Sequence, residues 1–320
     1  MPAEIIQEAK LSVLDAIGVG LIASRRPWSQ ITAAVAQESG GGDFSSVWGH
    51  PFKTSPQQAA LANSTAVHGI EMDDRRPFVR VHAGCIAIPS TFAVAEKVGA
   101  SGRDYLTSVV SAYELGYRVG HAVRVMPGIH AAGHIGVWVG VGGAANGLSL
   151  DARQFTNAMG LAGSMATSAL AEFTQDPEGT MVKRLHMGLS SHHGVLAALL
   201  AQKGFTGPAT VLEGMNGYGN IFTPDKSDLH FEALTDRLGS YFSIVEREIK
   251  AYSAWGGSHT VIETAGQLMA EHGIKPGDIE WIRVGGSNYL VDEHESTRPR
   301  SIMAAQYSLP FITAAALCKG

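Results

Sequence analysis

The stretch from Asp176 to Pro208 reads DPEGTMVKRLHMGLSSHHGVLAALLAQKGFTGP, and it predicts the central helix of the fold. Residues 189–202 place leucine and valine on one side and small residues elsewhere, and Lys203-Gly204 follows. A cation in the last turn and a glycine just beyond it are typical of a helix C-terminus. Lys183 and His186 are expected just before this helix, where exposed N–H groups and the positive dipole end favour an anion. The stretch alone equally allows a surface lysine in front of an ordinary core helix.

The composition predicts a large buried interior rather than a charged binding surface. The chain has 320 residues, of which 45% are hydrophobic and 17% are charged, and 38 are glycines. This length favours about two domains, and the many small residues favour closely packed helices, often with a subunit interface. The net charge of −5 argues against a nucleic-acid partner. Two cysteines in apolar surroundings suit a reducing compartment and give no disulfide framework.

The N-terminal segment lacks the pattern of a secretory signal. Glu4 and Glu8 stand where a signal peptide needs positive charge. The longest apolar run, residues 135–145, is shorter than the ~20 residues that a membrane-spanning helix needs. We therefore expect a cytoplasmic protein without a membrane partner.

Helical periodicity dominates the first part of the chain and changes after Gly239. Helices are predicted over residues 3–23, 30–37, 56–72, 86–98, 102–125 and 136–147, and another begins at Asp151. Residues 240–252 are predicted to be extended, and residues 279–286 alternate as in a strand. Ser258 is expected to cap a helix that ends near His272, and residues 303–318 are again helical. The predicted fold is mainly α, with an all-helical domain over residues 1–239 and a smaller α+β domain over residues 240–320.

The segment HGIEMDDRRPFVRVHAG, residues 68–84, crowds acidic and basic groups into one predicted loop. Such groups can shift one another's pKa and supply a general acid or base. By residue type alone, a solvated loop with paired charges is favoured. His82 lies among small and apolar residues, which makes a surface role for it less convincing. The ionisable residues of interest here are Glu71, Asp73, Asp74, Arg75, Arg76 and His82.

Two further places hold candidate groups outside the central stretch. His130 and His134 are four residues apart, but the glycines around them indicate a loop, and no glutamate completes a metalloprotease pattern. A zinc site is therefore not predicted, and proton transfer by one histidine is favoured. Lys250 ends the extended segment in an aromatic setting, and His259 follows a glycine-rich entry to a helix.

No recognised cofactor motif is present in the sequence. The chain lacks a GxxxxGK[ST] phosphate loop, a dinucleotide fingerprint after a strand and a GxSxG elbow. Lysines, histidines and a carboxylate suit a cofactor-free enzyme that acts on a polycarboxylate. Lysines would hold carboxylates, while a histidine, carboxylate or lysine would move a proton α to a carboxylate. Residue types alone point only weakly to this chemistry.

Six segments together resemble the MmgE/PrpD family, which includes 2-methylcitrate dehydratase, cis-aconitate decarboxylase and iminodisuccinate epimerase. They occur in family order across nearly the whole chain, and residues 183–222 are the most specific. The resemblance implies a helical domain and a smaller α+β domain with the active site between them, usually in a cytoplasmic homodimer. The segments are residues 68–84, 101–120, 127–136, 182–222, 249–259 and 306–320.

The resemblance also carries roles to individual positions. The residues implied to be catalytic, with Glu71 where members commonly have aspartate, are Glu71, His82, His130, Lys183 and Lys250. The residues expected to bind substrate are Asp74, Arg75, His186 and His259. No metal and no cofactor are expected.

The sequence departs from the family pattern in two places within the loop. Arg75 follows the paired aspartates where a threonine is common, and His82-Ala83 replaces the usual His-Pro. Arginine binds carboxylates bidentately, which allows a substrate other than methylcitrate. The alternative is that Arg75 simply pairs with Asp73 or Asp74.

The ends of the chain also differ from the family pattern. Family members continue well past the helix that follows residues 306–311, so we expect a truncated and incomplete second domain. Three hypotheses remain at this stage. The first is a lyase that dehydrates or decarboxylates a small polycarboxylate, with a hydro-lyase favoured. The second is an isomerase or epimerase of a dicarboxylate, and the third is a catalytically inactive truncated homologue.

Overall fold

The computed structural model describes residues 1–77, 79–174, 176, 178–286 and 294–319. The chain divides into two compact units. The first, the helical unit, comprises residues 1–170 and 182–249, and the second comprises residues 171–181 and 250–320. In the part of the chain that the structure describes, helices account for most of the regular structure, so the mainly α prediction is confirmed.

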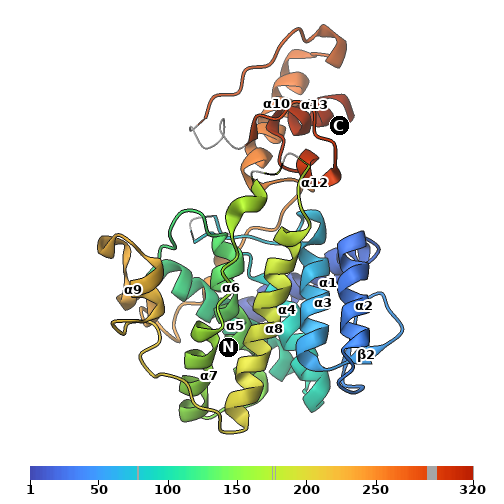
Figure 1. Ribbon diagram of the computed structural model, residues 1–320. Helices are drawn as coiled ribbons and strands as arrows, with labels where there is room; N and C mark the ends of the chain where they lie inside the picture. The colour runs from blue at the N-terminus through green and yellow to red at the C-terminus, as the bar shows by residue number, and fades with distance from the viewer. Residues whose placement is uncertain (78, 175, 177, 287–293, 320) are drawn as a thin grey trace. The chain divides into compact units, whose positions relative to one another are not determined.

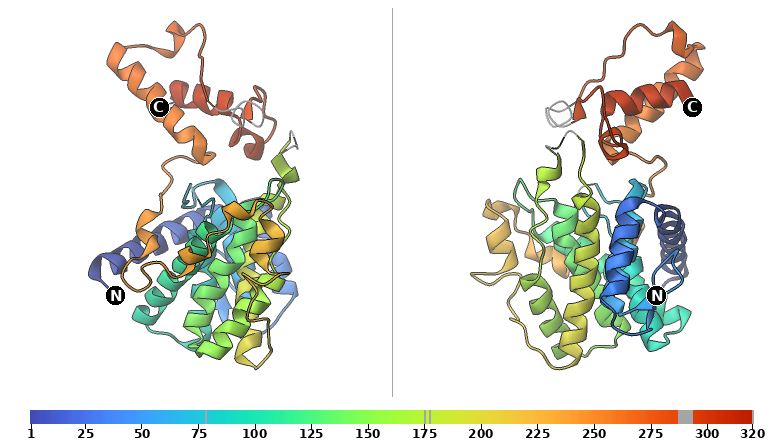
Figure 2. Two further views of the ribbon diagram at one scale, coloured as in Figure 1. Left: turned by 90° about the vertical axis from the view of Figure 1, so that its left-hand side faces the viewer. Right: turned by 45° about the vertical axis from the view of Figure 1, so that its right-hand side comes forward.

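The helical unit is a bundle in which α3, α4, α6 and α8 run side by side (Figures 1 and 2). A short antiparallel hairpin of β1 (Ser45–Ser46) and β2 (Lys53–Thr54) is attached to it. None of the helices in the described ranges is both long enough and apolar enough to cross a membrane. The helices are α1 (Ala3–Ala23), α2 (Pro27–Glu38), α3 (Pro56–Val67), α4 (Gly84–Val98), α5 (Gly102–Ala122), α6 (Ala131–Gly147), α7 (Ala152–Ser164), α8 (Val182–Gln202) and α9 (Tyr218–Phe222), and short 3-10 turns are η1 (His68–Ile70), η3 (Lys226–Asp228), η4 (Phe231–Leu234) and η5 (Ser243–Glu246).

Helix α6 lies at the centre of the bundle and is almost entirely buried. It packs closely on α8 because glycines face each other across the contact. A Cβ added at Gly194 would lie 2.5 Å from the backbone nitrogen of Val141 and 2.6 Å from the carbonyl carbon of Gly140. The small residues, from which the sequence predicted closely packed helices, therefore allow the backbones of α6 and α8 to approach each other.

Two helices begin earlier than the sequence indicated. Helix α8 starts at Val182 rather than near residue 189, so Lys183 and His186 lie inside its first turns. Helix α6 starts at Ala131, directly after His130, and includes His134. Charged residues are rarely buried unless they are paired. The partner of Lys183 and Arg184 is Glu71, more than 110 residues away in the chain, so the local pattern gave no reason to bury them.

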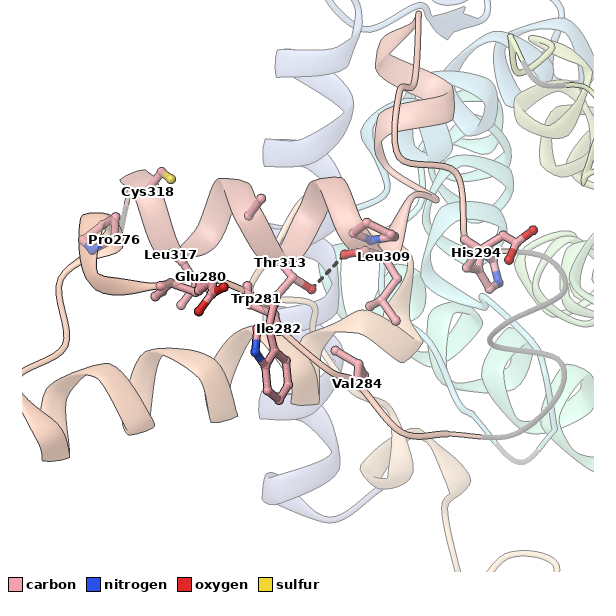
Figure 3. Close-up of a pocket in the computed structure, with 14 residues that line it drawn as sticks. Pro276, Glu280, Trp281, Ile282, Val284, His294, Leu309, Thr313, Leu317 and Cys318 are labelled. Atoms are coloured by element: carbon pink, nitrogen blue, oxygen red, sulfur yellow. Dashed lines mark hydrogen bonds between the residues drawn. The ribbon is translucent and has the colours of Figure 1, made fainter.

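The second unit is small, and the regular structure of its described residues is helical. It contains η2 (Ala171–Thr174), η6 (Gly256–Ser258), α10 (His259–His272), η7 (Pro276–Asp278), α12 (Ile302–Ala305) and α13 (Leu309–Lys319). A cavity of about 520 Å³ is lined by α13 and by residues 279–284, including Trp281 and Leu309 (Figure 3). In Figure 3, the hydroxyl of Thr313 donates to the carbonyl of Leu309 at 2.8 Å.

Two predicted extended segments and one predicted cap are wrong. Residues 240–252 contain η5 instead of a strand, and residues 279–286 have no regular structure. A strand is stable only when a neighbour pairs with it, and none of the described residues pairs with residues 279–286. Ser258 precedes α10 without capping it, because its hydroxyl donates to the carbonyl of Trp255 at 2.6 Å.

Candidate active site

A buried ion cluster forms where the first turn of α8 meets the end of η1. The ammonium of Lys183 and the guanidinium of Arg184 both donate to Oε1 of Glu71. The exposed fractions of these side chains are 5%, 0% and 2%, respectively. Glu71 has a φ of 56°, a left-handed conformation that is uncommon for a residue with a side chain. The two cations therefore hold a strained turn and fix the carboxylate inside the helical unit.

A chain of hydrogen bonds leads from Lys183 through His68 to Asp73, and His82 adjoins its end. The Nζ of Lys183 lies 2.8 Å from Nε2 of His68, whose Nδ1 lies 2.8 Å from Oδ2 of Asp73. The same carboxylate oxygen lies 3.1 Å from Nδ1 of His82. Burial, together with the charge of Lys183, lowers the pKa of His68 to about 3 although Asp73 opposes the shift. His68 is therefore neutral, donating to Asp73 and accepting from Lys183.

His82 is the accessible end of this chain. Its side chain is 19% exposed, whereas the Asp73 carboxylate is fully buried. Nδ1 of His82 faces both Oδ2 of Asp73 and the carbonyl of Asp74, at 3.1 and 3.0 Å. Both are acceptors, so the hydrogen-bond network assigns the proton to Nδ1 and leaves Nε2 as the basic nitrogen. A carboxylate that fixes the tautomer of a histidine is the usual way to prepare a general base.

A second histidine pair adjoins the first. Nδ1 of His130 lies 3.1 Å from Nδ1 of His186, and the rings of His68 and His130 are 6.3 Å apart between centroids. Burial lowers the pKa of His186 to about 4, and Lys183 adds to this shift. Burial and Lys183 likewise hold the pKa of His130 well below its usual range. Both shifts favour the neutral rings, so neither histidine adds positive charge beside Lys183.

The four histidines His68, His82, His130 and His186 are called the histidine row below. Asp74 holds the loop in place, and its carboxylate binds groups other than these rings. Its carboxylate accepts from the backbone N–H of Gly84 at 2.7 Å and from the hydroxyl of Tyr113. Burial raises the pKa of Asp74, although both hydrogen bonds oppose the shift. Its carbonyl is one of the two acceptors of His82. The structure thus ties Asp74 to the start of α4 and to α5.

Three donor atoms in this region could in principle surround a metal ion. Nδ1 or Nε2 of His68, a carboxylate oxygen of Asp73 and Sγ of Cys85 lie within 4.8 Å of one another. However, His68 and Asp73 are bonded to each other, and the second nitrogen of His68 faces the Lys183 ammonium. Burial raises the pKa of Cys85 well above its ordinary value, and metals bind the thiolate. The donor set therefore fits a hydrogen-bonded relay better than a cation.

The two arginines of the loop point elsewhere. Arg75 binds Oε2 of Glu248 through its guanidinium at 2.9 Å, and the backbones of the two residues also form a bridge. Arg76 binds the carboxylate of Glu246. The alternative in which Arg75 pairs with Asp73 or Asp74 is therefore wrong, since those carboxylates are held by histidines, Gly84 and Tyr113. Glu248, the partner of Arg75, lies in the segment 240–252 that was predicted to be extended.

Lys250 and His259 belong to the second unit. Lys250 is buried, with 3% of its surface exposed. His259 begins α10, and its ring lies 5.2 Å from that of Tyr252 between centroids. Their assigned roles stay predictions.

The structure brings six of the nine predicted site residues into the region around the start of α8, η1 and the loop before α4. These are Glu71, Asp74, His82, His130, Lys183 and His186. It adds His68 and Arg184, which the sequence analysis did not single out, and it places Asp73, one of the loop's candidate ionisable groups, between two histidines. His68 and Asp73 flank Glu71 in the quoted loop motif, and that motif was the only signal available for them. The cluster brings two cations, their shared carboxylate and four histidines together within the helical unit.

Comparisons with known proteins identify the family. The MmgE/PrpD N-terminal domain matches residues 1–230, and the MmgE/PrpD C-terminal domain matches residues 252–320. The cis-aconitate decarboxylase-like protein oryM of Aspergillus oryzae is 30% identical over 290 residues, which are 85% of this chain and 59% of that protein. Cis-aconitate decarboxylase of Aspergillus terreus is 27% identical over 340 residues, 99% of this chain and 68% of that protein. The human cis-aconitate decarboxylase is 26% identical over 341 residues, 99% of this chain and 66% of that protein.

The chain therefore spans 59% to 68% of the length of these relatives. The two family matches, over residues 1–230 and 252–320, cover nearly all of the chain. On this evidence, the chain is a member of the MmgE/PrpD family.

Proposed function

We propose that this chain is a cofactor-independent lyase that decarboxylates or dehydrates a small polycarboxylate. The observation that carries the proposal is the group of four histidines beside Lys183, with Nδ1 of His82 facing the carbonyl of Asp74 and the carboxylate of Asp73. The relatives named cis-aconitate decarboxylase make decarboxylation of cis-aconitate the first reaction to test. We therefore rank decarboxylation above dehydration, the reaction that the sequence analysis favoured.

The proposed decarboxylation needs only a proton and a clamp for carboxylates. A proton adds to one carbon of the substrate double bond, and the bond from carbon to the departing carboxylate supplies the electrons of the new double bond. Carbon dioxide leaves, so one proton enters and one CO₂ departs. Lys183 would stabilise the negative charge of a substrate carboxylate. His82 or His130 would deliver the proton, after taking it from solvent.

The remaining predicted residues complete the proposal. Lys250 is proposed as a second carboxylate clamp, with His259 and Arg75 as further substrate contacts. For Arg75, the ion pair with Glu248 would have to open first. We also propose a cytoplasmic homodimer, as the family resemblance implies, and light scattering of the purified protein tests the dimer.

Proton NMR in deuterated buffer tests the reaction directly. The purified protein is incubated with cis-aconitate, other tricarboxylates and aspartate-like dicarboxylates. A new vinyl signal with release of CO₂ supports decarboxylation, and a new vinyl signal without CO₂ supports dehydration. His82→Gln should abolish either reaction, whereas Glu38→Gln, an exposed change on α2, should leave it intact. A folded protein that converts none of these compounds would reject the lyase proposal for them.

The alternative functions give different results in the same experiment. Deuterium that enters the substrate with racemisation, without a vinyl signal, supports an isomerase or epimerase. Tight binding of a polycarboxylate without turnover supports an inactive homologue. These outcomes are distinguished in one set of spectra.

A further inference from the structure

A polar cavity of about 360 Å³ lies in the helical unit, apart from the histidine row. It is formed by α5, the loop that contains Arg76, and the segment from residue 230 to residue 246. None of the proposed catalytic residues lines it. Among its lining residues are Arg76, Arg118, His121, Asp236, Arg237 and Glu246.

Arg76 is a buried cation with an incomplete set of partners. Its side chain is 7% exposed, and its NH2 group binds the carboxylate of Glu246. Its other terminal nitrogen, NH1, is buried and has no hydrogen-bond partner within the described parts of the chain. Burial lowers the pKa of Arg76, which reflects the loss of water around the charge. Burying an N–H donor without an acceptor is unfavourable, and a guanidinium fork matches an oxyanion well.

Two further arginines line the cavity, and both are paired with carboxylates. Arg118 is held by Glu114 through Nε at 3.0 Å, and its NH1 donates to the carbonyl of Asp236 at 2.7 Å. Arg237 pairs with the Asp236 carboxylate at 3.1 Å and is 63% exposed. Each of the three arginines has a carboxylate partner, Glu246, Glu114 or Asp236, so these charges balance. The donor that they leave without an acceptor is NH1 of Arg76.

We propose that this cavity binds a small compound through its carboxylate or phosphate group, as a second oxyanion site outside the active site. NH1 of Arg76 is the inner donor, and Arg237 is the outer one. The site is linked to the catalytic loop, because the backbone N–H of Arg76 donates to the carbonyl of Val81 at 3.0 Å and His82 follows. A ligand here would therefore stabilise the position of His82.

NMR titration of the His121 imidazole tests the proposal, with inorganic phosphate and citrate as probes. Partial burial lowers the pKa of His121, and Arg76 and Arg118 lower it further. An oxyanion between them should raise that pKa and shift the His121 signals in a saturable way. The signals are identified by their absence in His121→Gln. Arg237→Gln should weaken the response at least tenfold, because it removes an exposed cation without touching the core.

The control is Arg124→Gln, which removes another exposed arginine that does not line the cavity and is 76% exposed. It should titrate like the unchanged protein. A response to phosphate alone or to citrate alone supports the site and identifies its preferred oxyanion. No saturable shift with either probe, or an equal response in Arg237→Gln, overturns the proposal. The readout is binding, so it does not depend on the proposed lyase activity, and Lys183→Met should retain it.

Discussion

Replacing Glu71 by glutamine should destabilise the fold more than removing either of its cationic partners. Glu71 is the shared anion of Lys183 and Arg184, and all three side chains are at least 95% buried. Glu71→Gln leaves two buried cations facing a neutral amide. Breaking a buried ion pair by removing one partner costs about 3–5 kcal/mol, because an uncompensated charge stays in the interior.

Lys183→Met is the matched comparison. It removes one of two cations, so Glu71 keeps its ion pair with Arg184, and methionine fills a similar volume. The lost hydrogen bonds to Glu71 and His68 should cost about 1–3 kcal/mol. The expected difference between the two variants is about 2 kcal/mol. At a urea m-value of ~3 kcal/mol/M, this corresponds to a midpoint that is ~0.7 M lower for Glu71→Gln.

Urea unfolding followed by far-UV circular dichroism measures this difference, because most of the helix signal comes from the unit that contains the cluster. Glu38→Gln, on the exposed end of α2, should change the free energy of unfolding by no more than about 0.5 kcal/mol. A Glu71→Gln midpoint at or above that of Lys183→Met would refute the reasoning. It would mean that Glu71 does not neutralise both cations.

Three further predictions use other parts of the helical unit. Gly194→Ala should lower the free energy of unfolding by about 1–3 kcal/mol, because the added Cβ would meet backbone atoms of α6. Gly18→Ala, with open space around its Cβ, should raise it by about 0.5–1 kcal/mol. Thermal melts of the two variants compare these effects. Burial and two neighbouring aspartates raise the pKa of Asp15 to about 7. The folded state therefore loses stability as the pH rises from about 4 to 7. Asp15→Asn should raise the Tm at pH 8 and leave it unchanged at pH 3, which thermal melts at the two pH values measure. Lys183→Met should raise the pKa of His186 from about 4, since one of the two causes of its depression is removed; histidine NMR titration measures this, and an unmoved pKa would contradict it.

The sequence by itself determined the class of the fold and predicted six residues that the structure brings together around the start of α8. Helical periodicity and the abundance of small residues were enough to predict a helical bundle, because spacing and composition are properties of the sequence itself. The first helix spans the predicted residues 3–23, and α5 begins at the predicted residue 102. The family motifs indicated Glu71, His82, His130 and Lys183 as one group.

Only the tertiary structure decided which of these groups touch and which charges are neutralised. Lys183 lies inside α8 because Glu71, far away in the chain, compensates its charge. His68 became part of the site because it lies between Lys183 and Asp73, and the sequence around it showed no difference from a core histidine. Arg75 forms an ion pair with Glu248, which lies in a segment that the sequence had predicted to be a strand. Burial of charge depends on partners brought together by folding, and strand formation depends on a neighbour, so neither follows from a local pattern.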